Sequence, residues 1–139
     1  AGFVALQQAY NLVDRSYEGE LSRVVAEHGL GSAPYWGLAK GFLTGKYRPG
    51  VAVESARAAA ASKYLDDRGL RVLAALDEIA ANHDTTQAAV ALVWLAEQPT
   101  VAAPIASART TDQLADLLPA LHLELKADEL ATLTAASAV

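Results

Sequence analysis

The sequence predicts an α/β fold built on parallel strands. Three short apolar segments, at residues 3–8, 30–35 and 101–106, have the length and the non-alternating apolar character of buried strands. A pattern typical of an amphipathic helix lies between the first two, at residues 18–28, and this strand–helix–strand order indicates a parallel βαβ unit. The 139 residues, 53% of them hydrophobic, are sufficient for one domain with its own core.

Helices dominate the second half of the chain. Within residues 70–81, Leu73, Leu76, Ile79 and Ala80 form one apolar helical face. Threonines that can accept a hydrogen bond from a helix N-terminus precede two further apolar stretches. The remaining predicted helices run from Thr85 or Thr86 to Gln98, from Thr110 or Thr111 to Leu118, and from Lys126 to Ala136.

A long excursion separates the second strand from these helices. Residues 36–67 are first rich in glycine and then rich in alanine, with Arg57 and Lys63 in the alanine-rich part. Loops of this length in compact domains are usually functional or mobile. No residue between Arg48 and Asp67 is diagnostic of a particular ligand.

Composition excludes several classes of function. A net charge of −5, a pI near 5.1 and the lack of a Lys/Arg cluster argue against nucleic acid or an anionic membrane as partner. The chain has no cysteine, and its three histidines lack metal-ligand spacing, so neither a disulfide, a thiolate nor a metal site is predicted. No apolar run approaches the ~18–20 residues of a membrane helix and no signal peptide is evident, so we expect a cytoplasmic protein. The absence of methionine suggests a fragment of a longer chain.

Generic nucleotide motifs do not fit. Residues 41–47 superficially suggest a phosphate loop but lack the GxxxxGK[ST] spacing, and the glycines at 29–31 follow a helix where a dinucleotide fingerprint follows a strand. The carboxylate pairs, Asp66 with Asp67 and Asp77 with Glu78, are interpreted as solvated surface groups.

Four phrases, in order along the chain, resemble those of the aldo-keto reductase family. Residues 35–47 (YWGLAKGFLTGKY) are similar to the stretch YSPLGRGLLTGKY after barrel strand seven, and residues 104–114 (PIASARTTDQL) to PIPGARTPEQL after strand eight. Residues 6–12 resemble the strand-six phrase QxEYN, and residues 87–95 the helical phrase AQVALAWL. The resemblance implies that the whole chain, 1–139, is the C-terminal segment of one (β/α)₈ TIM-barrel domain.

The resemblance also implies a site for NADP. Gln7 would bond the nicotinamide carboxamide and Tyr35 would stack on the nicotinamide ring. The backbone of Leu38 and the side chain of Lys40 would approach the pyrophosphate. Arg109 and Gln113 would flank the adenosine 2′-phosphate, where a guanidinium favours a dianion over a hydroxyl and the helix starting near Thr111 adds its positive end. The cofactor-binding residues implied by the resemblance are Gln7, Tyr35, Trp36, Leu38, Lys40, Ser107, Arg109, Gln113 and Asp116.

The chain departs from the family pattern at several of these positions. Trp36-Gly37 replaces the usual Ser-Pro, so the strap over the pyrophosphate is expected to differ in shape. Ser107 replaces a glycine, and Leu117 replaces an asparagine that contacts adenine, although Asp116 keeps the neighbouring acidic position. Recognition of the 2′-phosphate is therefore better supported than recognition of adenine.

Catalytic residues are expected elsewhere. The family's Asp, Tyr, Lys and His lie on earlier barrel strands, and no substitute is found here. A barrel needs roughly 200–250 residues or more, so three strands cannot close one, and the N-terminal part of the barrel is the expected partner. The intact protein is then an NADP-dependent oxidoreductase that reduces aldehyde or ketone substrates, whereas this segment alone is inactive. The alternative is a non-catalytic nucleotide-binding module that serves regulation or assembly.

Overall fold

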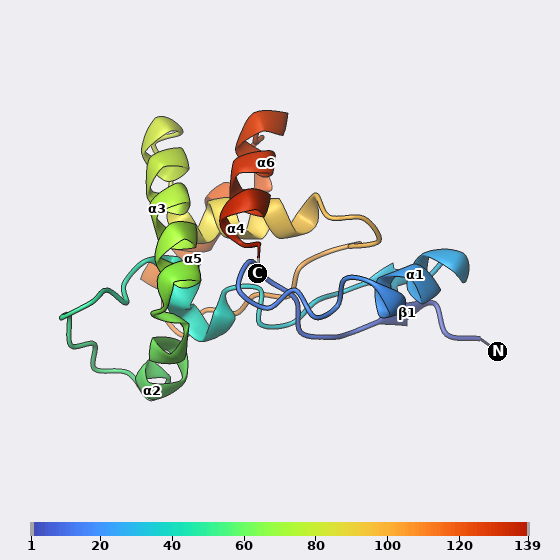
Figure 1. The fold of residues 1–139 in the computed structure, drawn as a ribbon, viewed down its shortest axis with the longest axis horizontal. Helices are drawn as coiled ribbons and strands as arrows, with labels where there is room; N and C mark the ends of the chain where they lie inside the picture. The colour runs from blue at the N-terminus through green and yellow to red at the C-terminus, as the bar shows by residue number, and fades with distance from the viewer. Residues whose placement is uncertain (1, 139) are drawn as a thin grey trace.

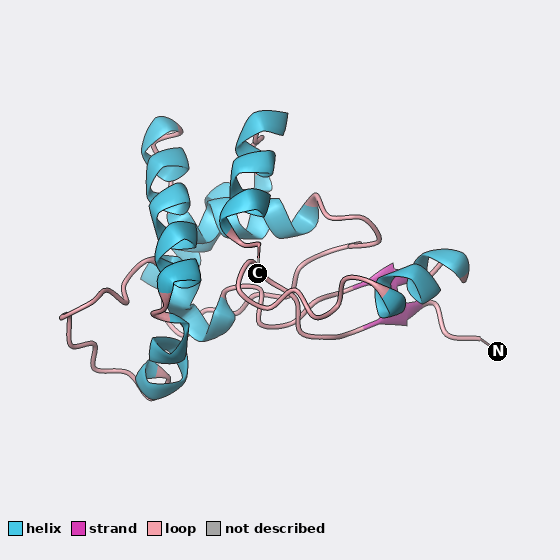
Figure 2. Ribbon diagram, in the orientation of Figure 1, coloured by secondary structure: helices cyan, strands magenta, loops and turns pink. Residues whose placement is uncertain are grey.

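The computed structural model describes residues 2–138, and its elements are those of an α/β chain (Figure 1). Both strands lie near the N-terminal end of the molecule, whereas α3, α4 and α6 gather at the other end (Figure 2). The elements are β1 (Ala5–Leu6), α1 (Glu20–Glu27), β2 (Gly31–Ser32), the 3-10 helix η1 (Ala39–Thr44), α2 (Ala58–Ala61), the 3-10 helix η2 (Ser62–Tyr64), α3 (Asp67–Asn82), α4 (Gln87–Ala96), α5 (Thr111–Leu117), the 3-10 helix η3 (Leu118–Leu121) and α6 (Ala127–Ala136).

The predicted strands are parallel neighbours, but they are shorter than expected. β1 pairs with β2 in parallel, and a parallel bridge joins Ser32 of β2 to Val101, so β2 lies between the other two segments. The ranges 3–8, 30–35 and 101–106 were too long, because regular strand covers two residues in β1 and in β2 and a single bridge at Val101.

Proline interrupts the pairing between β2 and the segment at Val101. Hydrogen bonds between the segments continue beyond the strands, from Tyr35 N–H to the Gln8 carbonyl (2.9 Å) and from Ile105 N–H to the Pro34 carbonyl (2.8 Å). Pro34 and Pro104 have no N–H to donate, so each leaves a gap in the pairing. The three segments therefore run side by side as far as residues 35 and 105 without forming long strands.

Helix α3 begins three residues earlier than the sequence pattern predicts. The Asp66 side chain accepts a hydrogen bond from Gly69 N–H (2.7 Å) and so caps the helix at its N-terminus. The predicted apolar face is confirmed, since Leu73, Leu76, Ile79 and Ala80 are all buried.

Helix α4 is the central helix of the cluster. Of the two predicted capping residues, Thr85 and Thr86, it is Thr86 that caps the helix, with its Oγ1 accepting from Ala89 N–H (3.1 Å). Every residue from Ala88 to Leu95 is buried, as expected for a helix that is apolar on all sides. It contacts α3, α5, η1 and η3, so it joins the helices of the C-terminal half to the segment that follows β2.

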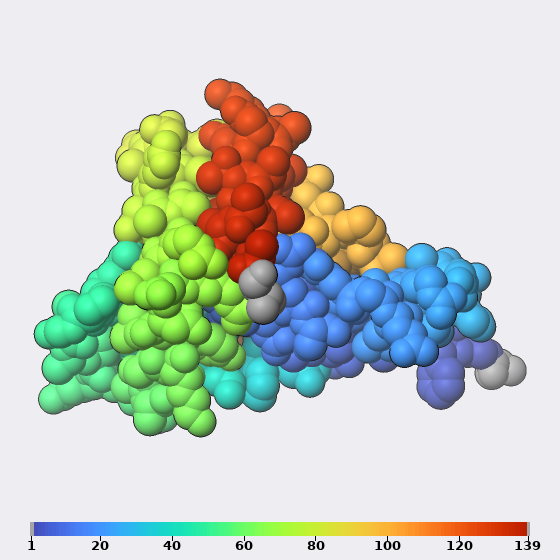
Figure 3. Space-filling view, in the orientation of Figure 1, coloured from blue at the N-terminus to red at the C-terminus, as the bar shows by residue number. Residues whose placement is uncertain are grey.

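Helix α6 packs on α3 and lies beside the N-terminal segment that follows β1 (Figure 3). The Glu129 carboxylate accepts from Lys126 N–H (2.8 Å) and bonds the His83 imidazole (2.9 Å). The Lys126 N–H, with His83 adding to it, lowers the pKa of Glu129 from its ordinary value. Arg15 donates to the Thr134 carbonyl and to Ser137 Oγ, both at 3.0 Å, and thereby fastens the segment after β1 to α6.

The long excursion at residues 36–67 has short helices of its own. The tight turns of η1 begin it, and the alanine-rich part forms α2 and η2, where Ala61 is fully buried. The excursion is therefore partly ordered by packing, because small alanine side chains allow α2 to approach η1 closely. None of the helices within residues 2–138 combines the length and the apolar character needed to cross a membrane.

Candidate cofactor site

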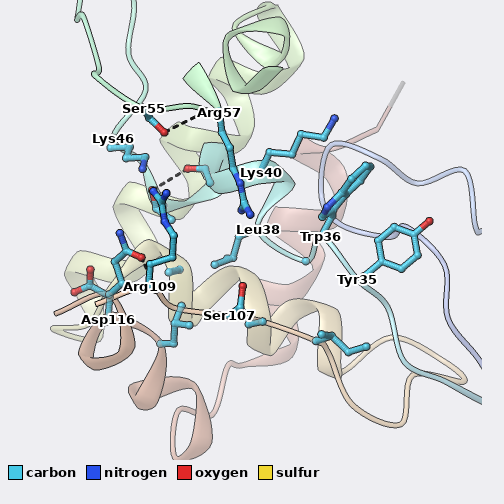
Figure 4. Close-up of a pocket in the computed structure, with 18 residues that line it drawn as sticks. Tyr35, Trp36, Leu38, Lys40, Lys46, Ser55, Arg57, Ser107, Arg109 and Asp116 are labelled. Atoms are coloured by element: carbon cyan, nitrogen blue, oxygen red, sulfur yellow. Dashed lines mark hydrogen bonds between the residues drawn. The ribbon is translucent and has the colours of Figure 1, made fainter. Parts of the chain in front are cut away.

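A cleft of about 470 Å³ opens where the segment after β2 meets the segment after Val101 (Figure 4). Ala88, at the start of the central helix α4, contributes to its wall, and Ser55 and Arg57 approach from the excursion. The cleft is lined by Tyr35, Trp36, Gly37, Leu38, Lys40, Gly41, Thr44, Lys46, Ser55, Arg57, Ala88, Ile105, Ala106, Ser107, Arg109, Gln113, Asp116 and Leu117.

Eight of the nine predicted cofactor-binding residues line this one cleft. They come from two segments that are more than sixty residues apart in the sequence, and the parallel alignment of the strands brings them together. Gln7 is the exception: it is exposed at the end of β1 and does not belong to the lining, so its contact with a carboxamide stays a prediction. The eight are Tyr35, Trp36, Leu38, Lys40, Ser107, Arg109, Gln113 and Asp116.

The cleft concentrates positive charge in an acidic chain. Four cationic side chains, those of Lys40, Lys46, Arg57 and Arg109, face one carboxylate, that of Asp116, whereas the chain as a whole carries a net charge of −5. An excess of positive side chains along one cleft gives it a positive potential, which attracts anions. The site is therefore suited to a ligand that carries several negative charges.

Two of these cations were missed as site residues from the sequence alone. Lys46 stands in the stretch that carries the family resemblance, but no role was assigned to it. Arg57 lies in the part of the excursion that was judged to lack diagnostic residues, and Ser55 accepts a hydrogen bond from Arg57 N–H (3.2 Å) at the same edge of the cleft. Only the fold of residues 48–57 carries Arg57 back toward Arg109, so no local pattern could have identified it.

A tight turn at residues 36–41 shapes the wall nearest β2. Trp36, Ala39, Lys40 and Gly41 all have a positive φ, of 57°, 48°, 59° and 94° respectively. Non-glycine residues are rare in this left-handed region, and they persist where surrounding contacts determine the backbone. The turn therefore needs contacts from outside itself.

Those contacts come from Asn11 and from α4. The Trp36 carbonyl accepts from Ala39 N–H (2.7 Å) and from the side-chain amide of the buried Asn11 (3.0 Å). Gly37 lies so close to α4 that an added Cβ would meet Leu95 at 3.0 Å and Leu92 at 3.3 Å. The glycine that replaces the family's proline thus allows the turn to pack directly on the central helix.

Two aromatic rings lie at one end of the cleft. Tyr35 and Trp36 are 38% and 49% exposed, and their rings meet edge to face with centroids 5.4 Å apart. The Lys40 ammonium lies over the Trp36 ring, 4.3 Å from its centroid. Figure 4 shows the two rings side by side at this end of the cleft, with Trp36 between Tyr35 and Lys40.

At the opposite end, Arg109 and Gln113 are joined to each other. Gln113 Oε1 accepts from Arg109 N–H (3.0 Å), and Thr110 Oγ1 accepts from Gln113 N–H (3.2 Å), which caps α5 as predicted. Because its amide oxygen is engaged, Gln113 presents its NH₂ group as a donor to a ligand. Arg109 and Gln113 can therefore both donate to the same anion.

The described residues of the cleft include no cluster of metal ligands. Within residues 2–138 no three His, Asp or Glu side chains are close enough to share a metal ion. Tyr10 is buried away from the cleft, and burial together with its hydrogen bond to Glu18 raises the pKa of its phenol. Its hydroxyl is thus committed to the core and is unsuited to acid catalysis.

Comparison with known proteins agrees with these features. The model of the aldo/keto reductase family matches residues 1–138. Protein Tas of Escherichia coli is 36% identical over 135 residues, which are 95% of this chain and 39% of that protein. A probable voltage-gated potassium channel subunit beta of Arabidopsis thaliana is 32% identical over 129 residues, which are 88% of this chain and 39% of that protein. An L-glyceraldehyde 3-phosphate reductase of E. coli O157:H7 is 30% identical over 134 residues, which are 90% of this chain and 39% of that protein.

The chain thus spans 39% of the length of each of these three relatives. The family match covers both segments that line the cleft, together with the three parallel segments that bring them together. On this evidence the chain belongs to the aldo/keto reductase family.

Proposed function

We propose that the intact protein is an NADP-dependent oxidoreductase that reduces an aldehyde or ketone to an alcohol, and that this chain holds the cofactor. The observation that carries the proposal is the cleft itself, with aromatic rings at one end, four cations along it and a single carboxylate. The arrangement of these side chains along the cleft is complementary to a molecule with an aromatic ring, several phosphates and a base. When bound, the cofactor would supply the hydride for the carbonyl carbon.

Each part of the cleft then has a task. Tyr35 stacks on the nicotinamide ring and Gln7 bonds its carboxamide. The Leu38 backbone and the side chain of Lys40 hold the pyrophosphate, to which Lys46 and Arg57 add positive charge. Arg109 and Gln113 bind the 2′-phosphate, for which a planar guanidinium is well shaped, while Ser107 and Asp116 line the wall beside it.

The parallel segments belong, in this proposal, to a (β/α)₈ barrel completed by the N-terminal part of the same protein. Phe3 and Val4 support it, because they are 92% and 80% exposed at the start of β1, and exposed apolar residues beside an open strand edge call for a covering partner. That part of the barrel would supply the proton donor together with its lysine and aspartate partners.

A non-catalytic nucleotide-binding module is the second candidate. The specific observation in its favour is the similarity to a protein named as a probable channel subunit, which suggests that such a cleft can belong to an assembly. In that case the same residues would bind NADP for regulation or assembly without turnover.

Cofactor oxidation separates the two candidates. We expect the full-length protein to consume NADPH in the presence of simple aldehydes or ketones. The loss of NADPH absorbance at 340 nm measures this consumption. Residues 1–139 alone, as control, should show no turnover, since they lack a proton donor with lysine and aspartate partners. NADPH binding without turnover on a broad carbonyl panel would favour the binding module, and failure to bind NADPH would contradict both.

A further inference from the structure

Each of the two cleft lysines lies against an aromatic ring, and neither pairs with a carboxylate of the described residues. Lys40 Nζ lies 4.3 Å from the centroid of Trp36, and Lys46 Nζ lies 5.2 Å from that of Tyr47. Outside the cleft, Arg15, Arg23 and Arg48 pair with Glu18, Glu27 and Asp77 at 2.6–2.7 Å. Among the ion pairs of residues 2–138, none involves a cation of the cleft.

From this contrast we infer that Trp36 is a positioning residue, which holds the ammonium of Lys40 at the rim of the cleft without neutralising it. The inference rests on the proposed function for the identity of the ligand. It assigns to Trp36 an action through Lys40, where the family resemblance suggested a direct contact with the cofactor. The ligand that the Lys40 ammonium would bind is a polyphosphate or pyrophosphate ester.

Electrostatics explains why a ring serves this purpose better than a carboxylate. A carboxylate beside Lys40 would cancel its charge and compete with the phosphate for the same ammonium. The face of an indole attracts a cation through its quadrupole and leaves the net charge in place. The ring therefore restricts the flexible lysine stem while the ammonium stays available to an anion.

The backbone fits the same role. Trp36 and Lys40 both occupy the left-handed region, at φ 57° and 59°, and this conformation brings two side chains four residues apart onto one side of the turn. Asn11, only 2% exposed, anchors the Trp36 carbonyl from the segment after β1. The backbone of Trp36 is thus anchored to the core, and its ring contacts Tyr35 and Lys40.

A double-mutant cycle in the full-length protein tests the inference. The variants are Trp36→Leu, Trp36→Phe, Lys40→Met and the double variant Trp36→Leu/Lys40→Met, titrated by calorimetry with NADPH and with inorganic pyrophosphate. We expect Trp36→Leu to weaken both by about two- to fivefold, the range of an exposed cation–π pair, and Trp36→Phe to retain most of the affinity. In the Lys40→Met background, Trp36→Leu should cause no further loss.

Two outcomes of the double-mutant cycle would overturn the inference that Trp36 positions Lys40. Additive losses would mean that Trp36 contacts the ligand directly, and unchanged affinity in Trp36→Leu would mean that Lys40 needs no ring. Equal melting temperatures of the single variants and wild type serve as the control against a general loss of structure.

A measurement without ligand separates this inference from the proposed function. In protein labelled with ¹³C at lysine Cε, the Lys40 signal, identified by its absence in Lys40→Met, should be shifted upfield by the Trp36 ring current. The shift should vanish in Trp36→Leu and persist in Trp36→Phe. A wild-type signal at the ordinary lysine position would refute the contact, whether or not the protein binds NADPH, and an upfield signal without NADPH binding would count against the proposed function only.

Discussion

Arg109→Ala in the full-length protein should weaken NADPH binding by roughly ten- to a hundredfold and leave NADH binding nearly unchanged. Arg109 lines the cleft and is exposed, and its backbone N–H is already bonded to Gln113. A charge-assisted bond from arginine to a phosphate contributes about 1.5–3 kcal/mol, and each 1.4 kcal/mol is a factor of ten in affinity. Because NADH has a hydroxyl in place of the 2′-phosphate, it has no such bond to lose.

Both cofactors should be titrated at one salt concentration, since exposed charge pairs are screened. Arg23→Ala is the matched control, because Arg23 lies on α1 outside the cleft and pairs with the exposed Glu27. It should leave both affinities unchanged. Equal losses of NADPH and NADH in Arg109→Ala would show that Arg109 supports the local fold, and no loss of either would exclude it from the site.

Trp94→Ala should lower the free energy of unfolding by about 3–5 kcal/mol, the cost typical of removing a buried tryptophan. Trp94 lies on the central helix α4, has no exposed surface, and donates from Nε1 to Thr134 Oγ1 of α6 (3.0 Å). Tyr10 meets its ring edge-on at 5.9 Å, and the Arg15 guanidinium lies 5.7 Å from the ring centroid. The ring thus joins the segment after β1 to α4 and α6, and its loss leaves a cavity between them.

Urea denaturation of the full-length protein measures this change. Leu121→Ala is the control, because Leu121 is 73% exposed, and it should change the stability by no more than about 0.5 kcal/mol. The free energy of unfolding of Trp94→Phe should lie between those of Trp94→Ala and Leu121→Ala, since this variant keeps a ring but loses the bond to Thr134. A Trp94→Ala variant as stable as Leu121→Ala would contradict the burial of the Trp94 ring and its bond to Thr134.

Local chemistry in the sequence predicted the helices well. The caps at Thr86 and Thr110 and the buried face of α3 appear as expected, because a cap or an amphipathic face depends on residues within a few positions of one another. The cap of α3 at Asp66 was missed, since a second aspartate follows it directly and no apolar repeat starts until Leu70. The strands were placed correctly but were too long, and the effect of Pro34 and Pro104 on the pairing between β2 and the segment at Val101 appears only once the pairing partners are known.

By itself, the sequence determined the α/β order, the parallel relation of the three segments, the family and eight of the residues that line the cleft. These depend on short-range patterns and on phrases whose order is preserved along the chain. Only the tertiary structure decided that Lys46 and Arg57 line the cleft and that Gln7 lies outside it. It also decided that the Lys40 ammonium contacts the Trp36 ring. The physical reason is that the fold of a long loop brings Arg57 to the cleft, and a left-handed turn anchored by Asn11 brings Trp36 to Lys40; neither arrangement follows from a sequence periodicity.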